Sequence, residues 1–190
     1  MKKIPDHAKK VFEGVIFDVY HWDQEMFDGS TAVFEAIRKR SAVFVLAVSE
    51  SKILINHEEQ PTRAPFLSLP GGLCDKGEHD HLLSAQRELL EETGYVSEDV
   101  VHWFGIQQFD HPKIDGTIDF YIAKNCKKVA EPTLDQGGEK IDTQLVSFDE
   151  FLELRSNPMF RLEGLLPLLE KAATDETEKQ TLQDLLGITT

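Results

Sequence analysis

Four glutamates, Glu78, Glu88, Glu91 and Glu92, lie close together in the segment LPGGLCDKGEHDHLLSAQRELLEETGY. If the end of this segment is helical, Glu88 and Glu92 are four residues apart and their carboxylates are neighbours on one face. Two like charges at this spacing destabilise an isolated helix by roughly 0.2–0.5 kcal/mol. A divalent cation removes that repulsion, because hard cations such as Mg²⁺ prefer carboxylate oxygens as ligands. The spacing therefore predicts a helix face that binds a cation.

The helix is predicted to span His81–Thr93, since both of its ends carry suitable capping residues. Asp80 fits the N-cap position, and Gly94 stands where a left-handed C-terminal cap belongs. The glutamates lie opposite an apolar arc formed by Leu82, Leu83, Ala85, Leu89 and Leu90. Arg87 precedes Glu91 by four residues, which is the spacing of a helical salt bridge. The prediction is a helix that packs on a core with one face and binds a cation with the other.

Gly71 and Gly72 precede the helix in a Pro-Gly-Gly turn. Because they lack a β-carbon, they let the backbone approach a ligand closely. A carbonyl of this turn can point at the same cation, and amides of the following loop can approach a phosphate. The turn is therefore expected to form a second side of the site.

Strand-like segments surround the helix. Residues 11–40 read as a hairpin with its turn at Asp28-Gly29, and residues 42–48 form a continuous apolar run that predicts a buried strand. Further strands are expected at 52–60, 66–70, 101–109, 116–126 and 141–148, with loops at 61–65 and 131–140. Asp149 is a possible N-cap for a helix through Leu154, and one or two more helices are expected over 158–173 and 175–187. This order predicts a mixed α/β fold.

The composition excludes several classes of protein. The 190 residues suffice for one domain with a core, and a formal net charge of −14 argues against a nucleic-acid duplex as the main partner. No apolar run approaches the roughly 20 residues of a membrane span, and the start MKKIPDH lacks the apolar centre of a secretion signal. Cys74 and Cys126 have no metal-type spacing and are expected to be free thiols. We expect a cytoplasmic protein.

A known motif covers the acidic segment. Gly72-x5-Glu78, followed by RELLEETGY from Arg87 to Tyr95, resembles the Nudix box, Gly-x5-Glu-x7-Arg-Glu-U-x-Glu-Glu-x-Gly-U, in which U is a bulky aliphatic residue. The second half matches at every position except the last, which is Tyr95. A match at this many defined positions is highly specific.

The spacing inside the motif departs from the family pattern. Eight residues separate Glu78 from Arg87, whereas the family has seven, and His79 occupies the position expected for the glutamate. We place the extra residue between Gly77 and Asp80, because the helix register from Asp80 onward is intact. The helical carboxylates then keep their places, whereas the position of Glu78 stays open.

The resemblance extends over about residues 11–155. The stretches 40–72, 14–40 and 134–151 are similar to the ADP-ribose and nucleoside-diphosphate-sugar pyrophosphatase branch of the Nudix superfamily. It implies a Nudix-type α/β/α sandwich, of the α/β (α+β) class, with a mixed central sheet, an N-terminal β-hairpin and C-terminal helices. The implied organisation is N-terminal strands at 1–40, a Nudix domain at 41–155 and a helical extension at 156–190. The hairpin of this branch often exchanges between subunits, so a homodimer is expected.

The resemblance also implies an activity. We expect hydrolysis, with Mg²⁺ or Mn²⁺, of a nucleoside diphosphate linked to another group, such as ADP-ribose or a nucleotide sugar, to a nucleoside monophosphate and a sugar phosphate. Two alternatives remain open. The substrate is a nucleoside triphosphate or a dinucleoside polyphosphate in the first, and the chain is a nucleotide-binding regulator with weakened turnover in the second.

The same resemblance assigns roles to single residues. The implied metal ligands are Glu88, Glu92, the carbonyl of Gly71 and Glu78. Glu91 is expected to support the site and Arg87 to orient it, while Glu139 in the late acidic loop is the best match for the catalytic base, although Gly137 stands where relatives carry a further acid. The expected substrate contacts are Arg63, Gly72 and Arg40, with possible help from Arg38 or Lys39.

Overall fold

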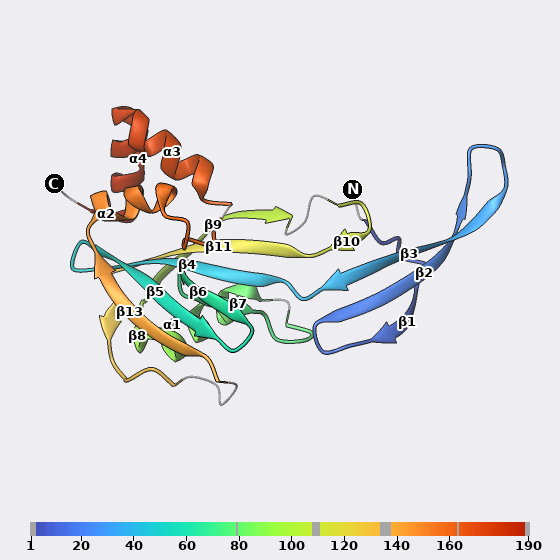
Figure 1. Ribbon diagram of the computed structural model, residues 1–190, viewed down its shortest axis with the longest axis horizontal. Helices are drawn as coiled ribbons and strands as arrows, with labels where there is room; N and C mark the ends of the chain where they lie inside the picture. Colours follow the sequence, from blue (N-terminus) through green and yellow to red (C-terminus); the bar gives the residue numbers. More distant parts are fainter. Residues whose placement is uncertain (1–2, 79, 108–110, 134–137, 163, 189–190) are drawn as a thin grey trace.

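A computed structural model describes residues 3–78, 80–107, 111–133, 138–162 and 164–188. A mixed β-sheet lies between helix α1 (His81–Thr93) on one face and the C-terminal helices on the other (Figure 1). The N-terminal strands form a second sheet that extends from one end of this body (Figure 1). The predicted Nudix-type sandwich with a mixed sheet, an N-terminal hairpin and C-terminal helices is confirmed.

The central sheet has seven strands. Their path is β13 (Lys140–Val146), β5 (Lys52–Gln60), β4 (Ala42–Ser49), β11 (Thr117–Lys124) and β9 (Asp99–Gln107), while β6 (Arg63–Ser68) pairs with β5 and β7 (Gly71–Leu73) pairs with β4. β11 runs parallel to β4, and the other pairs are antiparallel. Two short strands, β8 (Tyr95–Val96) and β12 (Lys127–Lys128), pair separately. β6 begins inside the expected loop 61–65, because a tight turn pairs Arg63 with Gln60.

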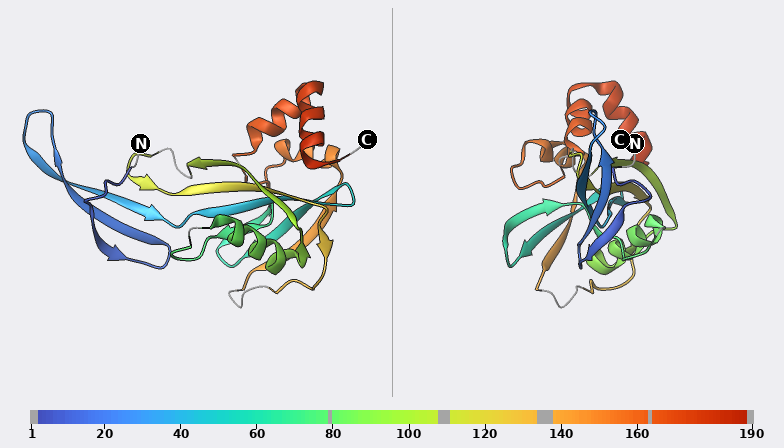
Figure 2. Two further views of the ribbon diagram at one scale, coloured as in Figure 1. Left: turned by 180° about the vertical axis from the view of Figure 1, so that it is seen from behind. Right: turned by 90° about the vertical axis from the view of Figure 1, so that its right-hand side faces the viewer.

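The N-terminal strands form a long arm. β1 (Lys9–Glu13), β2 (Phe17–Glu25) and β3 (Thr31–Lys39) pair in that order, and β10 (Ile114–Asp115) adds to β3. The expected hairpin turn is present, with Gly29 at φ 79° and the Asp28 carboxylate accepting a hydrogen bond of 2.9 Å from the Ser30 amide. The arm projects well beyond the central sheet (Figure 2).

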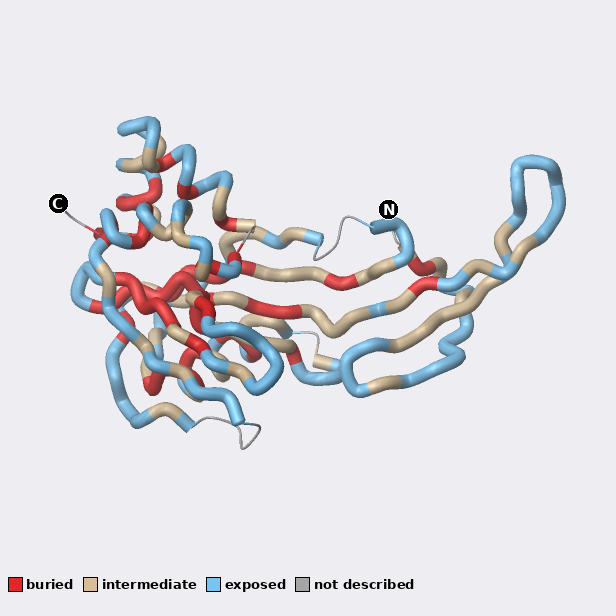
Figure 3. Tube along the Cα trace, viewed as in Figure 1, coloured by how far each residue is buried: buried red, intermediate tan, exposed pale blue. Residues whose placement is uncertain are grey.

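β4 has a hydrophobic core on each of its two faces. Val43, Val45 and Ala47 pack toward α1, whereas Leu46 and Val48 pack toward the C-terminal helices. Burial on both sides requires apolar residues at every position, which explains the continuous apolar run of this strand. Buried residues are concentrated in this part of the molecule, whereas the arm is mainly exposed or half-buried (Figure 3).

Helix α1 begins and ends as its sequence predicts. The Asp80 side chain accepts a hydrogen bond from the Leu82 amide at 3.1 Å, and Gly94 adopts φ 74° while its amide donates to Leu90. A polar contact adds to the packing of this helix on the sheet. His81 Nδ1 lies 2.8 Å from Asp119 of β11, and His102 Nε2 of β9 lies 3.0 Å from the same carboxylate.

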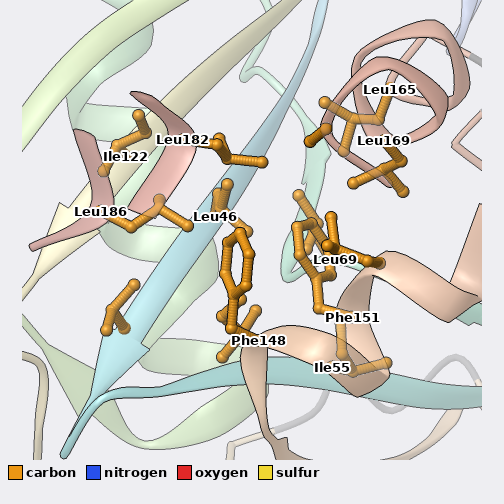
Figure 4. Close-up of a cluster of buried hydrophobic side chains, with 14 of the residues drawn as sticks. Leu46, Ile55, Leu69, Ile122, Phe148, Phe151, Leu165, Leu169, Leu182 and Leu186 are labelled. Carbon is orange, nitrogen blue, oxygen red and sulfur yellow. The ribbon is translucent and has the colours of Figure 1, made fainter. Parts of the chain in front are cut away.

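The C-terminal helices are α2 (Phe148–Glu153), α3 (Leu166–Thr174) and α4 (Glu176–Leu186), with a 3₁₀ turn at Leu154–Ser156. Ser147, and not Asp149 as expected, caps α2, because Ser147 and Glu150 form a reciprocal capping box. The expected helix over 158–173 begins only at residue 166. Apolar side chains of these helices pack on the sheet around Leu46, Ile55, Leu69 and Ile122 (Figure 4).

Within the described part of the chain, no helix is long and apolar enough to cross a membrane.

Candidate active site

Glu92 is the most deeply buried carboxylate of α1, with 9% of its surface exposed. Its Oε2 accepts hydrogen bonds from the amide of Gly71 at 2.8 Å and from Asn56 Nδ2 at 3.0 Å. Thr143 donates to Asn56 Oδ1 at 2.8 Å and so keeps the Asn56 amide directed at Glu92. Burial raises the pKa of Glu92 well above its ordinary value. Strands β5, β7 and β13 together hold this one carboxylate.

Glu88, one helical turn earlier, packs directly against the Pro-Gly-Gly turn. A β-carbon built on Gly72 would lie 2.8 Å from the carboxylate atoms of Glu88, so a larger residue would displace that carboxylate. Gly71 is more constrained, because a β-carbon there would lie 2.1 Å from the Val43 carbonyl oxygen, which belongs to the backbone. Burial also raises the pKa of Glu88. The two glycines therefore bring the backbone of β7 against the acidic face of α1, as the sequence predicts.

Arg87 joins two carboxylates of the helix, the mostly buried Glu88 and the half-exposed Glu91. Its Nη1 lies 3.0 Å from Glu91 Oε2 and 3.0 Å from Glu88 Oε1. The predicted Arg87–Glu91 salt bridge is confirmed, and the contact with Glu88 is additional. Its Nε lies 3.7 Å from Asp75 in the loop before the helix. The guanidinium thus fixes the direction of Glu88 and connects the helix to its preceding loop.

Glu58 on β5 is a member of the site that sequence reasoning missed. Its surface is 8% exposed, and its carboxylate accepts a hydrogen bond from Ser68 on β6. Burial raises the pKa of Glu58 to about 6, and the nearby Glu139 carboxylate contributes to the increase. The charge of Glu58 in turn raises the pKa of Glu92. Strand alternation is the signal that could have found it, since Leu54, Asn56 and Glu58 share the face of β5 that is directed toward α1.

Glu139 lies just before β13 and is exposed to solvent. Its Oε1 accepts a hydrogen bond of 2.9 Å from Gln60 at the end of β5. Its charge raises the pKa of both Glu58 and Glu92, after the larger effect of burial. The structure therefore brings Glu139 to the predicted site, while Gly137 lies outside the described residues.

Two of the expected site residues are engaged elsewhere. The Glu78 carboxylate accepts hydrogen bonds from the Ser84 hydroxyl and from the Asp75 amide at 3.2 Å. Arg40 donates to the Cys74 carbonyl from Nε at 2.7 Å, so its guanidinium is bound to the loop before α1. Neither Glu78 nor Arg40 lines the pocket that Glu58, Gly71 and Gly72 share.

Comparison with known proteins identifies the architecture. A family model described as the NUDIX domain matches residues 38–163. The chain belongs to the Nudix family. The "Methanol dehydrogenase activator" of Bacillus methanolicus is 30% identical over 148 residues, which are 77% of this chain and 79% of the relative. The prediction of a Nudix hydrolase is confirmed.

Two further similarities concern the predicted branch. The "ADP-ribose pyrophosphatase" of Bacillus subtilis (strain 168) is 33% identical over 91 residues, 47% of this chain and 49% of that protein. A crystal structure titled "ADP compounds hydrolase" superposes with a TM-score of 0.69 over all of both chains at 18% identity, which shows the shared fold. The predicted resemblance to the ADP-ribose pyrophosphatase-like branch is therefore confirmed.

A pocket of about 360 Å³ opens beside the Nudix carboxylates. Glu58, Gly71 and Gly72 line the end nearest the cluster, and Arg63 lies over the Phe66 ring at 5.1 Å. Lys39, which sequence analysis named as a possible helper, lines the pocket as well. Arg38 does not line it and pairs with Asp115 at 3.1 Å. The pocket places positive charge next to the acidic cluster.

The donor chemistry fits a hard divalent cation. The potential ligands are all carboxylate oxygens, from Glu58, Glu88, Glu92 and Glu139. Burying a carboxylate without a positive charge beside it is costly, as the raised pKa of Glu92 shows. No three acidic, histidine or cysteine side chains of the described residues already form a ligand cage. Each carboxylate is instead held by its own donor, namely Ser68, Arg87, Asn56 with Gly71, or Gln60.

The raised pKa of Glu58 predicts a pH-dependent stability. The folded protein binds this proton more tightly than the unfolded chain, so the stabilisation is complete below pH 4.5 and is lost as pH rises through about 6. The loss is on the order of 2 kcal/mol at 1.36 kcal/mol per pKa unit. Glu58→Gln removes the ionisable group and therefore the destabilisation that ionised Glu58 causes. Without metal, the free energy of unfolding of this variant is expected to exceed that of the wild type by roughly 2 kcal/mol at pH 7.5 and to equal it at pH 4.

Urea unfolding in EDTA between pH 4 and 8 measures this difference. Glu59→Gln is the matched control, because Glu59 is the exposed neighbour on the same strand and pairs with Lys140 at 3.7 Å. The control is expected to follow the wild type within about 0.5 kcal/mol. A Glu58→Gln curve parallel to that of the wild type at every pH would contradict the assignment.

Proposed function

We propose that the protein is a metal-dependent Nudix pyrophosphatase that hydrolyses a nucleoside diphosphate linked to another group, such as ADP-ribose or a nucleotide sugar. The products are a nucleoside monophosphate and a sugar phosphate. The observation that carries the proposal is the buried cluster of Glu58, Glu88 and Glu92 at the end of a pocket that also contains Arg63. The similarity to the Bacillus subtilis ADP-ribose pyrophosphatase supports the choice of substrate.

Glu58, Glu88 and Glu92 would hold Mg²⁺ or Mn²⁺, together with the carbonyl of Gly71. The ion, when bound, neutralises diphosphate charge and lowers the pKa of a bound water. We propose that Glu58 takes the place that the family pattern gives to Glu78. Glu58 is buried next to Glu92, whereas the Glu78 carboxylate is occupied by Ser84.

The remaining residues orient the reacting groups. Arg87 directs Glu88, and Asn56 together with the Gly71 amide directs Glu92. Arg63 binds a phosphate oxygen of the substrate, because a guanidinium matches phosphate geometry. Glu139 is the proposed base. It is exposed at the edge of the cluster, and only Gln60 donates a side-chain hydrogen bond to it within the described residues, so its carboxylate is open to a proton from the attacking water.

Hydrolysis is tested with a panel of ADP-ribose, nucleotide sugars, nucleoside triphosphates and dinucleoside polyphosphates, with Mg²⁺ or Mn²⁺ present. The wild type is expected to release a nucleoside monophosphate from the first two classes. Glu92→Gln is expected to reduce kcat by more than the roughly 10–100-fold that follows loss of a residue behind a metal ligand. Glu98→Gln, an exposed carboxylate outside the site, is the control.

The other outcomes separate the alternatives. If triphosphates or dinucleoside polyphosphates are cleaved preferentially, the proposed substrate class is wrong and the first alternative is supported. Tight nucleotide binding without any product supports the regulatory alternative and contradicts hydrolysis. If Glu92→Gln and the wild type hydrolyse the substrate at equal rates, the proposed active site is wrong.

We also propose that the protein is a homodimer that associates through the N-terminal arm. Large apolar side chains are exposed along the arm, among them Phe12, Val15, Phe27 and Val33. A row of exposed apolar side chains of this size marks an interaction surface. The resemblance to a branch with exchanged N-terminal strands supports a second copy of the chain as the partner.

Light scattering is expected to give twice the 21.6 kDa mass of one chain at micromolar concentration. Val33→Asp on the arm is expected to shift the mass toward one chain, because it places a charge in the apolar contact. Val129→Asp is the matched control, since both valines are similarly exposed, at 67% and 61%. A wild type with the mass of a single chain would rule out the dimer.

A further inference from the structure

The segment between α2 and α3 contributes a cation to the pocket beside the acidic cluster. Arg161, Leu162 and Gly164 line this pocket together with Gly71 and Gly72 of the Nudix turn. The same pocket has an apolar surface, which is formed by Phe44, Ile106, Ile118 and Phe120. The pocket therefore has a carboxylate end, an apolar surface, and three cations, Lys39, Arg63 and Arg161.

The backbone at Arg161 is fixed by the central sheet. Leu67 of β6 donates to the Met159 carbonyl at 2.8 Å, and the Arg161 amide donates to the Leu67 carbonyl at 2.9 Å. Leu67 and Phe160 form a parallel β-bridge. Phe160 and Leu162, on either side of Arg161, are buried in the core, whereas Arg161 is exposed. The alternation of an extended segment thus places Arg161 on the open side, in a position that does not depend on a flexible loop.

Two of the cations in this pocket, Arg63 and Arg161, lack a salt-bridge partner among the described residues, although the chain has a net charge of −14. Burial and the nearby Arg63 charge lower the pKa of Lys39, so two of the cations repel each other. Like charges held close together are stabilised when an ion of opposite charge binds between them.

A second polar pocket, between the arm and the loop before α1, provides the contrast. Lys39 lines both pockets, and four further cations of the second pocket form ion pairs. Lys10 and Lys76 pair with Glu13, Arg38 with Asp115, and Arg40 with Asp75. Arg63 and Arg161 differ from these four cations, because no carboxylate of the described residues forms an ion pair with them.

We propose that Arg161 binds the diphosphate of the substrate, and that the segment between α2 and α3 thereby takes part in substrate selection. The guanidinium would hold a phosphate oxygen through two parallel N–H donors. The group beyond the diphosphate would then lie on the apolar surface around Phe44 and Ile118. This inference rests on the proposed function for the identity of the anion as a nucleoside diphosphate derivative.

Steady-state kinetics with Mg²⁺ and the best substrate of the panel test the role. Hydrogen bonds to charged groups are worth about 1.5–3 kcal/mol, so Arg161→Ala is expected to raise KM about 10–100-fold. The kcat value is expected to change by no more than about twofold, because the proposed contact is made equally in the bound substrate and in the transition state. Arg161→Lys retains the positive charge but lacks the two parallel N–H donors of the guanidinium, so it is expected to give an intermediate KM.

Lys127→Ala is the matched control, since it also removes one positive charge from an exposed position, on β12 outside this pocket. Its KM is expected to equal that of the wild type. If Arg161→Ala shares the wild-type KM while the wild type hydrolyses its substrate, the role of Arg161 is wrong and the proposed function stands.

Calorimetric titration with ADP in the presence of Mg²⁺ separates the two proposals. If no substrate of the panel is cleaved, the proposed hydrolysis fails, but weaker ADP binding by Arg161→Ala than by the wild type still supports the anion contact. Equal ADP affinity in the two proteins, or no ADP binding by the wild type, overturns it.

Discussion

Repulsion among buried carboxylates is the constraint on which the rest of the structure depends. Glu58 and Glu92 are almost fully buried, and the charges of Glu58, Glu88 and Glu139 add to the cost that burial imposes on ionising Glu92. The protein limits that cost by giving each carboxylate its own hydrogen-bond donor, without neutralising the cluster. The result is a site that a divalent cation would stabilise more than any internal side chain does, which is the physical reason for an acidic helix face in a stable fold.

Packing on both faces of the central sheet holds the carboxylates in place. The two cores on either face of β4 fix the sheet, and the caps at Asp80 and Gly94 set where α1 begins and ends. Gly72 lets the Glu88 carboxylate approach the backbone, and a β-carbon at this position would push the carboxylate away. The C-terminal helices bury their apolar faces on the same sheet and carry residues 159–162 to β6, where Arg161 joins the pocket. Stability and recognition are therefore provided by the same contacts.

Local signals predicted the parts of the molecule that local physics determines. The span and caps of α1, the Asp28-Gly29 hairpin, the buried strand β4 and the Arg87–Glu91 pair all depend on residues within a few positions of one another. Glu58 and Arg161 were missed because they reach the site only through pairing between distant strands. Arg40 was expected to bind substrate, but carbonyls of a loop some 33 residues later occupy it. Glu78 was expected to bind the metal, but its carboxylate accepts a hydrogen bond from Ser84 in the first turns of α1. The extra residue before the helix accompanies this change of partner.

Titration of the protein with Mn²⁺, followed by electron paramagnetic resonance, tests whether Glu58 takes part in cation binding. We expect Glu58→Gln to weaken Mn²⁺ affinity at least about tenfold, as loss of a ligand or its close support does. Glu78→Gln should change it by no more than about twofold, the effect of a surface substitution. An affinity that falls with Glu78→Gln and is unchanged with Glu58→Gln would contradict the account.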